Sequence, residues 1–201
     1  MTIIGNTTME KLTPQTLYSL EEYARIRNAF RAEVMAHKKN RRLPLGDHAA
    51  LYFEDRLTMQ YQVQEMLRIE RIFEPEGIAD ELDAYNPLIP DGSNWKATFM
   101  LEYADAEERR QALAKLMGIE RAIWIQVDGH DRVHPVANED LERETGDKTA
   151  SVHFLRFELS PQMIAAVKRG ATVRAGIDHH AYRTECEIPI GVRSSLATDL
   201  H

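Results

Sequence analysis

The chain has 201 residues, of which 43% are hydrophobic and 28% charged, values typical of one folded globular domain. Its single cysteine, Cys186, excludes an intramolecular disulfide framework and a zinc or iron–sulfur site made of cysteines alone. The net charge of −7 argues against nucleic-acid binding, and no apolar run approaches the ~18 residues of a membrane span. Because the start lacks a secretory pattern, we expect one cytoplasmic domain over residues 1–201, with loose tails at 1–9 and 190–201.

The N-terminal half predicts two long helices separated by a strand. Ser19 and Glu22 fit a capping box, and apolar side chains then recur at steps of three and four, which predicts a helix to about Lys39. A strand over 48–54 follows. Residues 55–73 predict a second helix whose apolar side chains surround nearly its whole circumference. The polar stripe left on that helix comprises Gln60, Gln64, Arg68 and Arg71.

Shorter elements follow in the rest of the chain. The patterns predict helices over 78–85, 105–117 and 161–169, one helical turn over 139–144, and a loop over 85–95; the strands are expected at 96–103, 150–159, 172–177 and 182–188, with a hairpin over 122–136. The predicted fold is therefore α+β: a mostly antiparallel sheet with a central buried helix (55–73) and further helices packed on it.

Two carboxylates, Glu65 and Glu70, lie on the predicted central helix among apolar neighbours. A carboxylate in such surroundings either pairs with a cation or has a raised pKa. Arg68 follows Glu65 by three residues and is a partner for it within the helix. The alternatives for Glu65 and Glu70 are a structural ion pair or rim position, and a ligand-anchoring or proton-transferring group.

Histidines supply the next candidates. His153 lies on one face of a predicted strand, where it is either a hydrogen-bonded core residue or a ligand-binding group. Asp178 and His179 fall in a predicted turn, which presents side chains but supplies few metal ligands alone. No helix carries the Glu-x-x-His spacing of a di-iron site. We expect no metal and no cofactor.

The exit of the loop over 85–95 is a further candidate. Trp95 and Lys96 would place an aromatic plate beside a cation, since loops held by rigid elements often carry binding residues. The alternative is a proline-stiffened connection with Trp95 packed as an anchor.

Several long strings resemble a bacterial single-domain family of unknown function. They are SLEEYARIRNAFR (19–31), FEDR and QEMLRIERIFEPEGI (within 53–78), ELDAYNPLIPDGSNWKAT (81–98) and EDLERETGDKTASVHFLRFEL (139–159). Members are often encoded beside a rubrerythrin-like protein and an iron–sulfur oxidoreductase. The resemblance thus implies a link to redox or peroxide handling through such a partner.

Three classes of function follow as hypotheses. The first is an accessory protein that binds a redox partner or a small anionic ligand through the polar stripe and the loop at 85–96. The second is a cofactor-free or single-metal enzyme that uses Glu65 with His153 or His179. The third is a structural subunit, a homodimer for example, whose polar stripe is buried at a two-fold interface.

Overall fold

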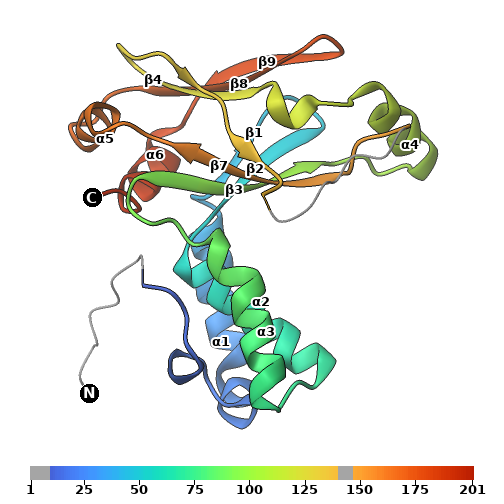
Figure 1. The fold of residues 1–201 in the computed structure, drawn as a ribbon, viewed down its shortest axis with the longest axis vertical. Coiled ribbons are helices and arrows are strands. Elements are labelled where there is room, and N and C mark those ends of the chain that lie inside the picture. Colours follow the sequence, from blue (N-terminus) through green and yellow to red (C-terminus); the bar gives the residue numbers. More distant parts are fainter. Residues whose placement is uncertain (1–9, 140–146) are drawn as a thin grey trace.

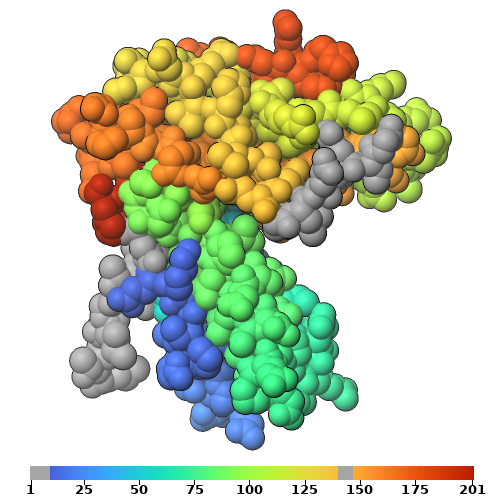
Figure 2. Space-filling model, in the orientation of Figure 1, coloured from blue at the N-terminus to red at the C-terminus, as the bar shows by residue number. Residues whose placement is uncertain are grey.

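The protein consists of a body of two sheets from which an arm of three helices projects (Figure 1). The computed structural model describes residues 10–139 and 147–201. The space-filling view shows the narrow arm extending from the wider body (Figure 2). The predicted α+β class with antiparallel pairing is confirmed, because every described strand pair is antiparallel.

The helices fall into two groups. The arm holds α1 (Leu20–Lys38), α2 (Arg56–Glu70) and α3 (Pro75–Tyr85). The body carries α4 (Ala106–Lys115), α5 (Pro161–Lys168) and α6 (Ile190–Ala197). Short 3-10 helices lie at η1 (Pro14–Thr16), η2 (Asn86–Leu88) and η3 (Ile119–Arg121).

The strands form a five-stranded sheet and a four-stranded sheet. The first has the order β1-β2-β3-β7-β6, with β1 (Arg42–Pro44), β2 (Ala49–Glu54), β3 (Asn94–Leu101), β7 (Val152–Glu158) and β6 (Val136–Ala137). The second has the order β5-β4-β8-β9, with β5 (Arg132–Val133), β4 (Ile123–Val127), β8 (Val173–His179) and β9 (Tyr182–Glu187).

One hydrophobic core lies between the two sheets. Residues of β2, β3 and β7 share a single buried cluster with residues of β4 and β8. Side chains alternate along a strand, so each strand of the five-stranded sheet sends every second residue into this core. On β3 the buried apolar residues are Trp95, Ala97, Phe99 and Leu101, and the residues between them lie on the opposite face.

The helix predicted to be central and buried lies in the arm instead. Its first three turns are covered: Met59, Val63 and Leu67 pack in the arm's own core. From Arg68 onwards the helix is exposed, and Ile69 is 60% exposed. The apolar residues near its end therefore do not indicate burial. Among the described residues, α2 packs in the arm against α1, α3, the segment before α1 and the residues around η2, and this packing leaves the end of α2 open.

Two glutamines of the predicted polar stripe bind the chain's own backbone. The Gln60 amide donates to the Thr16 carbonyl at 3.1 Å. Gln64 accepts from the Tyr18 amide at 2.6 Å and donates to the Tyr18 carbonyl at 3.3 Å. Both side chains are covered by this segment, so the prediction that they form a partner-binding stripe or a two-fold interface is wrong.

The predicted loose C-terminal tail is also wrong. Residues from Ile190 form α6, and Val192, Leu196 and Leu200 are buried in the main core. The tail at 1–9 and nearly all of the predicted turn at 139–144 lie outside the described residues. In the described part, no helix has both the length and the apolar character needed to cross a membrane.

Gly176 marks a position where β8 has no room for a side chain. A Cβ there would overlap the Trp124 ring and would lie 2.7 Å from the backbone oxygen of Thr184. Trp124 is 1% exposed and cannot move outwards without losing its packing.

We predict that Gly176→Ala lowers the free energy of unfolding by about 1–3 kcal/mol through overpacking. Urea denaturation followed by tryptophan fluorescence measures the change. Ser194→Ala, at an exposed position of α6, is the control and should unfold with the wild type. A Gly176→Ala protein of unchanged stability would contradict the packing described.

Candidate functional site

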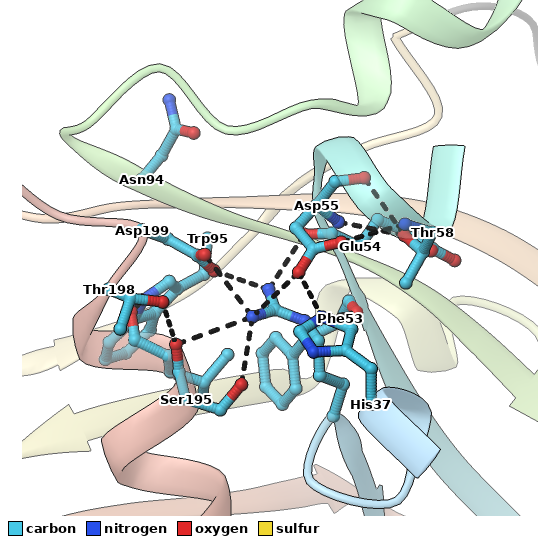
Figure 3. Close-up of polar contacts among 12 residues, drawn as sticks. His37, Phe53, Glu54, Asp55, Thr58, Asn94, Trp95, Ser195, Thr198 and Asp199 are labelled. Carbon is cyan, nitrogen blue, oxygen red and sulfur yellow. Dashed lines mark hydrogen bonds and ion pairs between the residues drawn. The ribbon is translucent and has the colours of Figure 1, made fainter. Parts of the chain in front are cut away.

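A buried cluster of charged groups lies where the arm meets the body (Figure 3). Its centre is Arg41, just after α1, whose side chain is 2% exposed. The guanidinium donates to Asp199 Oδ2 at 2.5 Å and lies 3.4 Å from Asp55 Oδ2. It also donates to the carbonyls of Phe53 and Glu54, each at 3.0 Å. The cluster therefore joins α1, the N-terminus of α2, β2 and the end of α6.

The two aspartates of this cluster compete for one guanidinium. Asp55 caps α2 by accepting from the Thr58 amide at 2.9 Å, and His37 Nε2 lies 2.5 Å from its other oxygen. Although burial opposes it, the hydrogen bond from His37 together with Arg41 lowers the pKa of Asp55. Burial raises the pKa of Asp199 to about 6 despite its ion pair with Arg41. We assign a structural role to this cluster, which is to hold the arm in place on the body. Its charged side chains are buried, and only His37 is partly exposed to solvent.

Glu65 is compensated within the arm. Arg27 from α1 donates to both of its oxygens, at 2.7 and 2.8 Å, and the Tyr23 hydroxyl donates at 2.7 Å. Arg68 adds a third partner at 3.2 Å. The hydrogen bonds from Arg27 lower the pKa of Glu65 to about 2. Glu65 is thus ionised at neutral pH, whereas Glu70 is exposed to solvent.

The histidine candidates do not approach Glu65, whose partners all belong to α1 and α2. His153 is fully buried on β7, within 3.1 Å of the Asn138 amide and 3.0 Å of the Ala150 carbonyl. These contacts fit a hydrogen-bonded core histidine. The hypothesis of an enzyme in which Glu65 acts together with His153 is therefore not supported by the geometry.

Asp178 and His179 belong to the end of β8 and not to a turn. Because neighbours on a strand point to opposite faces, Asp178 is exposed and pairs with Arg132 at 2.5 Å. His179 is buried; its Nε2 lies 3.0 Å from the Met117 carbonyl and its Nδ1 accepts from the Ala181 amide. Both ring nitrogens of His179 are therefore used by the protein itself. Within residues 10–139 and 147–201, no cluster of His, Cys, Asp or Glu has a metal-binding arrangement.

Trp95 and Lys96 point to opposite faces of β3. Trp95 is 1% exposed, packs edge-on against Phe53 and donates from Nε1 to the Leu196 carbonyl at 2.9 Å. It is an anchor for α6. The predicted pairing of an aromatic plate with a cation is wrong, because strand geometry separates the two side chains. Lys96 lies on the face turned towards the arm, where it donates to the Pro87 carbonyl.

Lys96 lines a pocket between the arm and the five-stranded sheet. The pocket has a volume of about 290 Å3, near the lower end for small-molecule sites. Its walls come from the end of α3 and η2 on one side, and from β3 and β7 on the other. The lining residues are Asp83, Ala84, Pro87, Leu88, Lys96, Glu139, Phe154, Leu155 and Arg156.

The two cations of this pocket differ in their partners. Arg156 makes a bidentate ion pair with Glu139, at 2.8 and 2.9 Å, and a second ion pair with Glu158 at 2.6 Å. Lys96 makes no ion pair with any residue in the described part of the chain. Burial is the largest cause that lowers the pKa of Lys96, and the charge of Arg156 acts in the same direction, whereas the charges of Asp91, Glu139 and Glu158 oppose them. Lys96 therefore has N–H donors available in the pocket.

Sequence reasoning identified Lys96 but missed most of its surroundings. Phe154, Arg156 and Glu139 come from β7 and the segment before it, and their approach to α3 depends on where the arm lies. The one available signal was alternation: Phe154 and Arg156 share the face opposite the core residues Leu155 and Phe157.

Comparison with known proteins gives a family but no activity. Residues 11–200 match the family described as "Protein of unknown function (DUF3501)". The chain belongs to this family. A crystal structure of a protein from Burkholderia pseudomallei, titled a novel protein of unknown function, is 49% identical with a TM-score of 0.91, covering 96% of this chain and 100% of that one. No curated protein matches the chain.

The family match confirms the resemblance to a family of unknown function. The neighbourhood of rubrerythrin-like and iron–sulfur proteins stays a prediction, as do the cytoplasmic location and the oligomeric state. The matched range includes both the junction around Arg41 and the pocket around Lys96.

We predict that Arg41→Met lowers the free energy of unfolding by about 3–5 kcal/mol, because it leaves two buried aspartates without their shared cation. Urea denaturation measures the loss. Arg31→Met, at an exposed position of α1, should change stability by less than about 0.5 kcal/mol. Equal stability of the two variants would show that the junction does not depend on Arg41.

Glu65 should make stability depend on acid pH. Since its pKa falls from 4.5 to about 2 on folding, its contribution is present above pH 4.5 and is lost as the pH falls from 4.5 towards 2. We predict that Glu65→Gln costs about 1–2 kcal/mol at neutral pH and flattens the loss below pH 4.5. Urea unfolding at a series of pH values tests this. Glu70→Gln is the control, and a wild-type pH slope in Glu65→Gln would refute the assignment.

Proposed function

We propose that the protein is a binding protein whose ligand is a small molecule with an apolar body and one anionic group. The single observation that carries this proposal is the pocket between arm and sheet, in which Lys96 has no carboxylate partner among the described residues. The bound ligand would contact both parts of the molecule.

The walls of the pocket suit an apolar ligand body. Leu88, Pro87 and Ala84 contribute from the arm, and Phe154 contributes from β7. Burial of apolar surface stabilises a complex by roughly 25 cal/mol per Å2. The small volume of about 290 Å3 favours a short chain or a single ring over a nucleotide-sized ligand.

The charges of the pocket favour an anionic head group. Arg156 forms ion pairs with Glu139 and Glu158, so its charge is already compensated within the protein and is not the group that attracts a ligand. An ammonium has three N–H donors, and Lys96 uses one on the Pro87 carbonyl. A carboxylate, sulfonate or phosphate oxygen would accept the remaining donors in a charge-assisted hydrogen bond.

Other hypotheses receive less support from the geometry. An enzyme based on Glu65 would need a carboxyl group that titrates near neutral pH, whereas the pKa of Glu65 is about 2. A redox partner of the rubrerythrin-like or iron–sulfur type stays a prediction from the family resemblance. It is compatible with a ligand-binding accessory role.

Octanoate is a suitable probe because it joins a short apolar chain to one carboxylate. We predict that it binds the wild type with one site per chain in isothermal titration calorimetry. Lys96→Met should weaken binding about tenfold, the equivalent of one charge-assisted hydrogen bond. Ala84→Trp should abolish binding, because the indole fills the pocket from the exposed surface of α3.

Each variant has a matched control. Ala79→Trp makes the same change on α3 at an exposed position outside the pocket, and Lys168→Met removes an exposed lysine of α5. Both controls should bind octanoate with wild-type affinity. If Ala84→Trp binds as well as Ala79→Trp, the pocket is not the binding site and the proposal fails.

A further inference from the structure

We propose that Lys96 forms a reversible imine with the carbonyl group of an aldehyde or ketone that enters the pocket between arm and sheet. This inference rests on the proposed function, since it takes the same pocket and names a reactive class of ligand for it. It adds a covalent step to what would otherwise be simple binding.

The first argument is the position of the amine. Lys96 projects from β3, a rigid support that is paired on both sides, into a pocket with apolar walls. The side chain is steadied by its hydrogen bond to the Pro87 carbonyl, which belongs to the opposite wall. An apolar carbonyl compound held between Phe154 and Leu88 would place its polar end at this amine.

The second argument is the electrostatic surroundings of the amine. A lysine becomes nucleophilic when it is desolvated in an apolar pocket or placed beside another cation. Lys96 meets the first condition, because burial is the largest cause that lowers its pKa. The charge of Arg156 acts in the same direction, whereas the charges of Asp91, Glu139 and Glu158 act against it. None of these three carboxylates, all within the described residues, forms an ion pair with Lys96.

The third argument is that imine formation needs no reactant beyond the amine, the carbonyl compound and water. The pocket is bordered by the exposed residue Asp83, so solvent can deliver and remove protons there. Glu139 is held in its ion pair with Arg156 and is not needed as a proton carrier. The neutral amine adds to the carbonyl carbon, and the carbonyl oxygen takes up a proton to give a carbinolamine. Loss of that oxygen as water forms the C=N bond. In sum, one ammonium and one carbonyl give one protonated imine and one water.

Lys11 provides an internal comparison for this reactivity. Its pKa is also lowered, by burial and by the charge of Lys96. However, Lys11 donates to two carbonyls, those of Asn86 at 2.8 Å and Ile89 at 3.0 Å, and it does not line the pocket. If Lys96 reacts selectively and Lys11 does not, the cause is therefore the binding of the carbonyl compound in the pocket and not a lowered pKa alone.

The test is reductive trapping of the full chain with hexanal and cyanoborohydride, which reduces the imine to a stable secondary amine. Peptide mass spectrometry then gives the rate of modification at each lysine. We expect Lys96 to be modified at least about tenfold faster than Lys11 or Lys168. Octanoate and the Ala84→Trp change should each remove this advantage, whereas Ala79→Trp should preserve it.

Two measurements on the wild type separate the inference from the proposed function: octanoate binding and the relative rate of adduct formation at Lys96. Lys96→Arg lacks a primary amine and should lose the selective adduct. If wild type binds octanoate but Lys96 reacts no faster than Lys11, the imine inference is overturned and the proposed function stands. If hexanal selectively modifies Lys96 but octanoate does not bind, the anionic ligand class is overturned and the imine is supported.

Discussion

The geometry of the whole molecule depends on one buried guanidinium. Arg41 joins the end of the first arm helix to Asp55 at the start of the second and to Asp199 behind α6. Taking a charge out of water costs several kcal/mol unless partners compensate it, and here every N–H direction of the guanidinium is used. The base of the arm therefore has one favourable arrangement relative to the sheets.

The pocket follows from that arrangement. With the arm fixed at its base, the end of α3 comes to lie over the outward face of β3 and β7. That face carries the residues that alternate with the core, Lys96 opposite Arg156 in register. A sheet face that would otherwise be open to solvent thus becomes one wall of a ligand-sized pocket. The binding chemistry that we propose and the packing that stabilises the fold therefore lie on opposite faces of the same strands.

Local patterns predicted most elements, and long-range packing decided the rest. The capping pattern at Ser19 and the apolar period up to Val34 identified α1, and Ser19 does accept from the Glu22 amide at 3.1 Å. The apolar residues around the whole circumference of α2 led to the wrong prediction of a central helix. The same pattern also fits a helix that is covered over only part of its length. Lys96 was identified as a candidate from its loop, yet its partners α3 and β7 are distant in sequence. The periodicity of apolar residues along the chain contains no information about contacts between such distant segments.

The ion pair of Arg41 with Asp199 also bears on how the protein folds. The two residues are 158 positions apart in the chain, so closing this contact costs chain entropy that nearby contacts do not. The capped helices of the arm and the hairpin of β8 and β9 join segments that are close in the chain, so we expect them to form first. We expect docking of the arm, and with it assembly of the pocket around Lys96, to come late in folding.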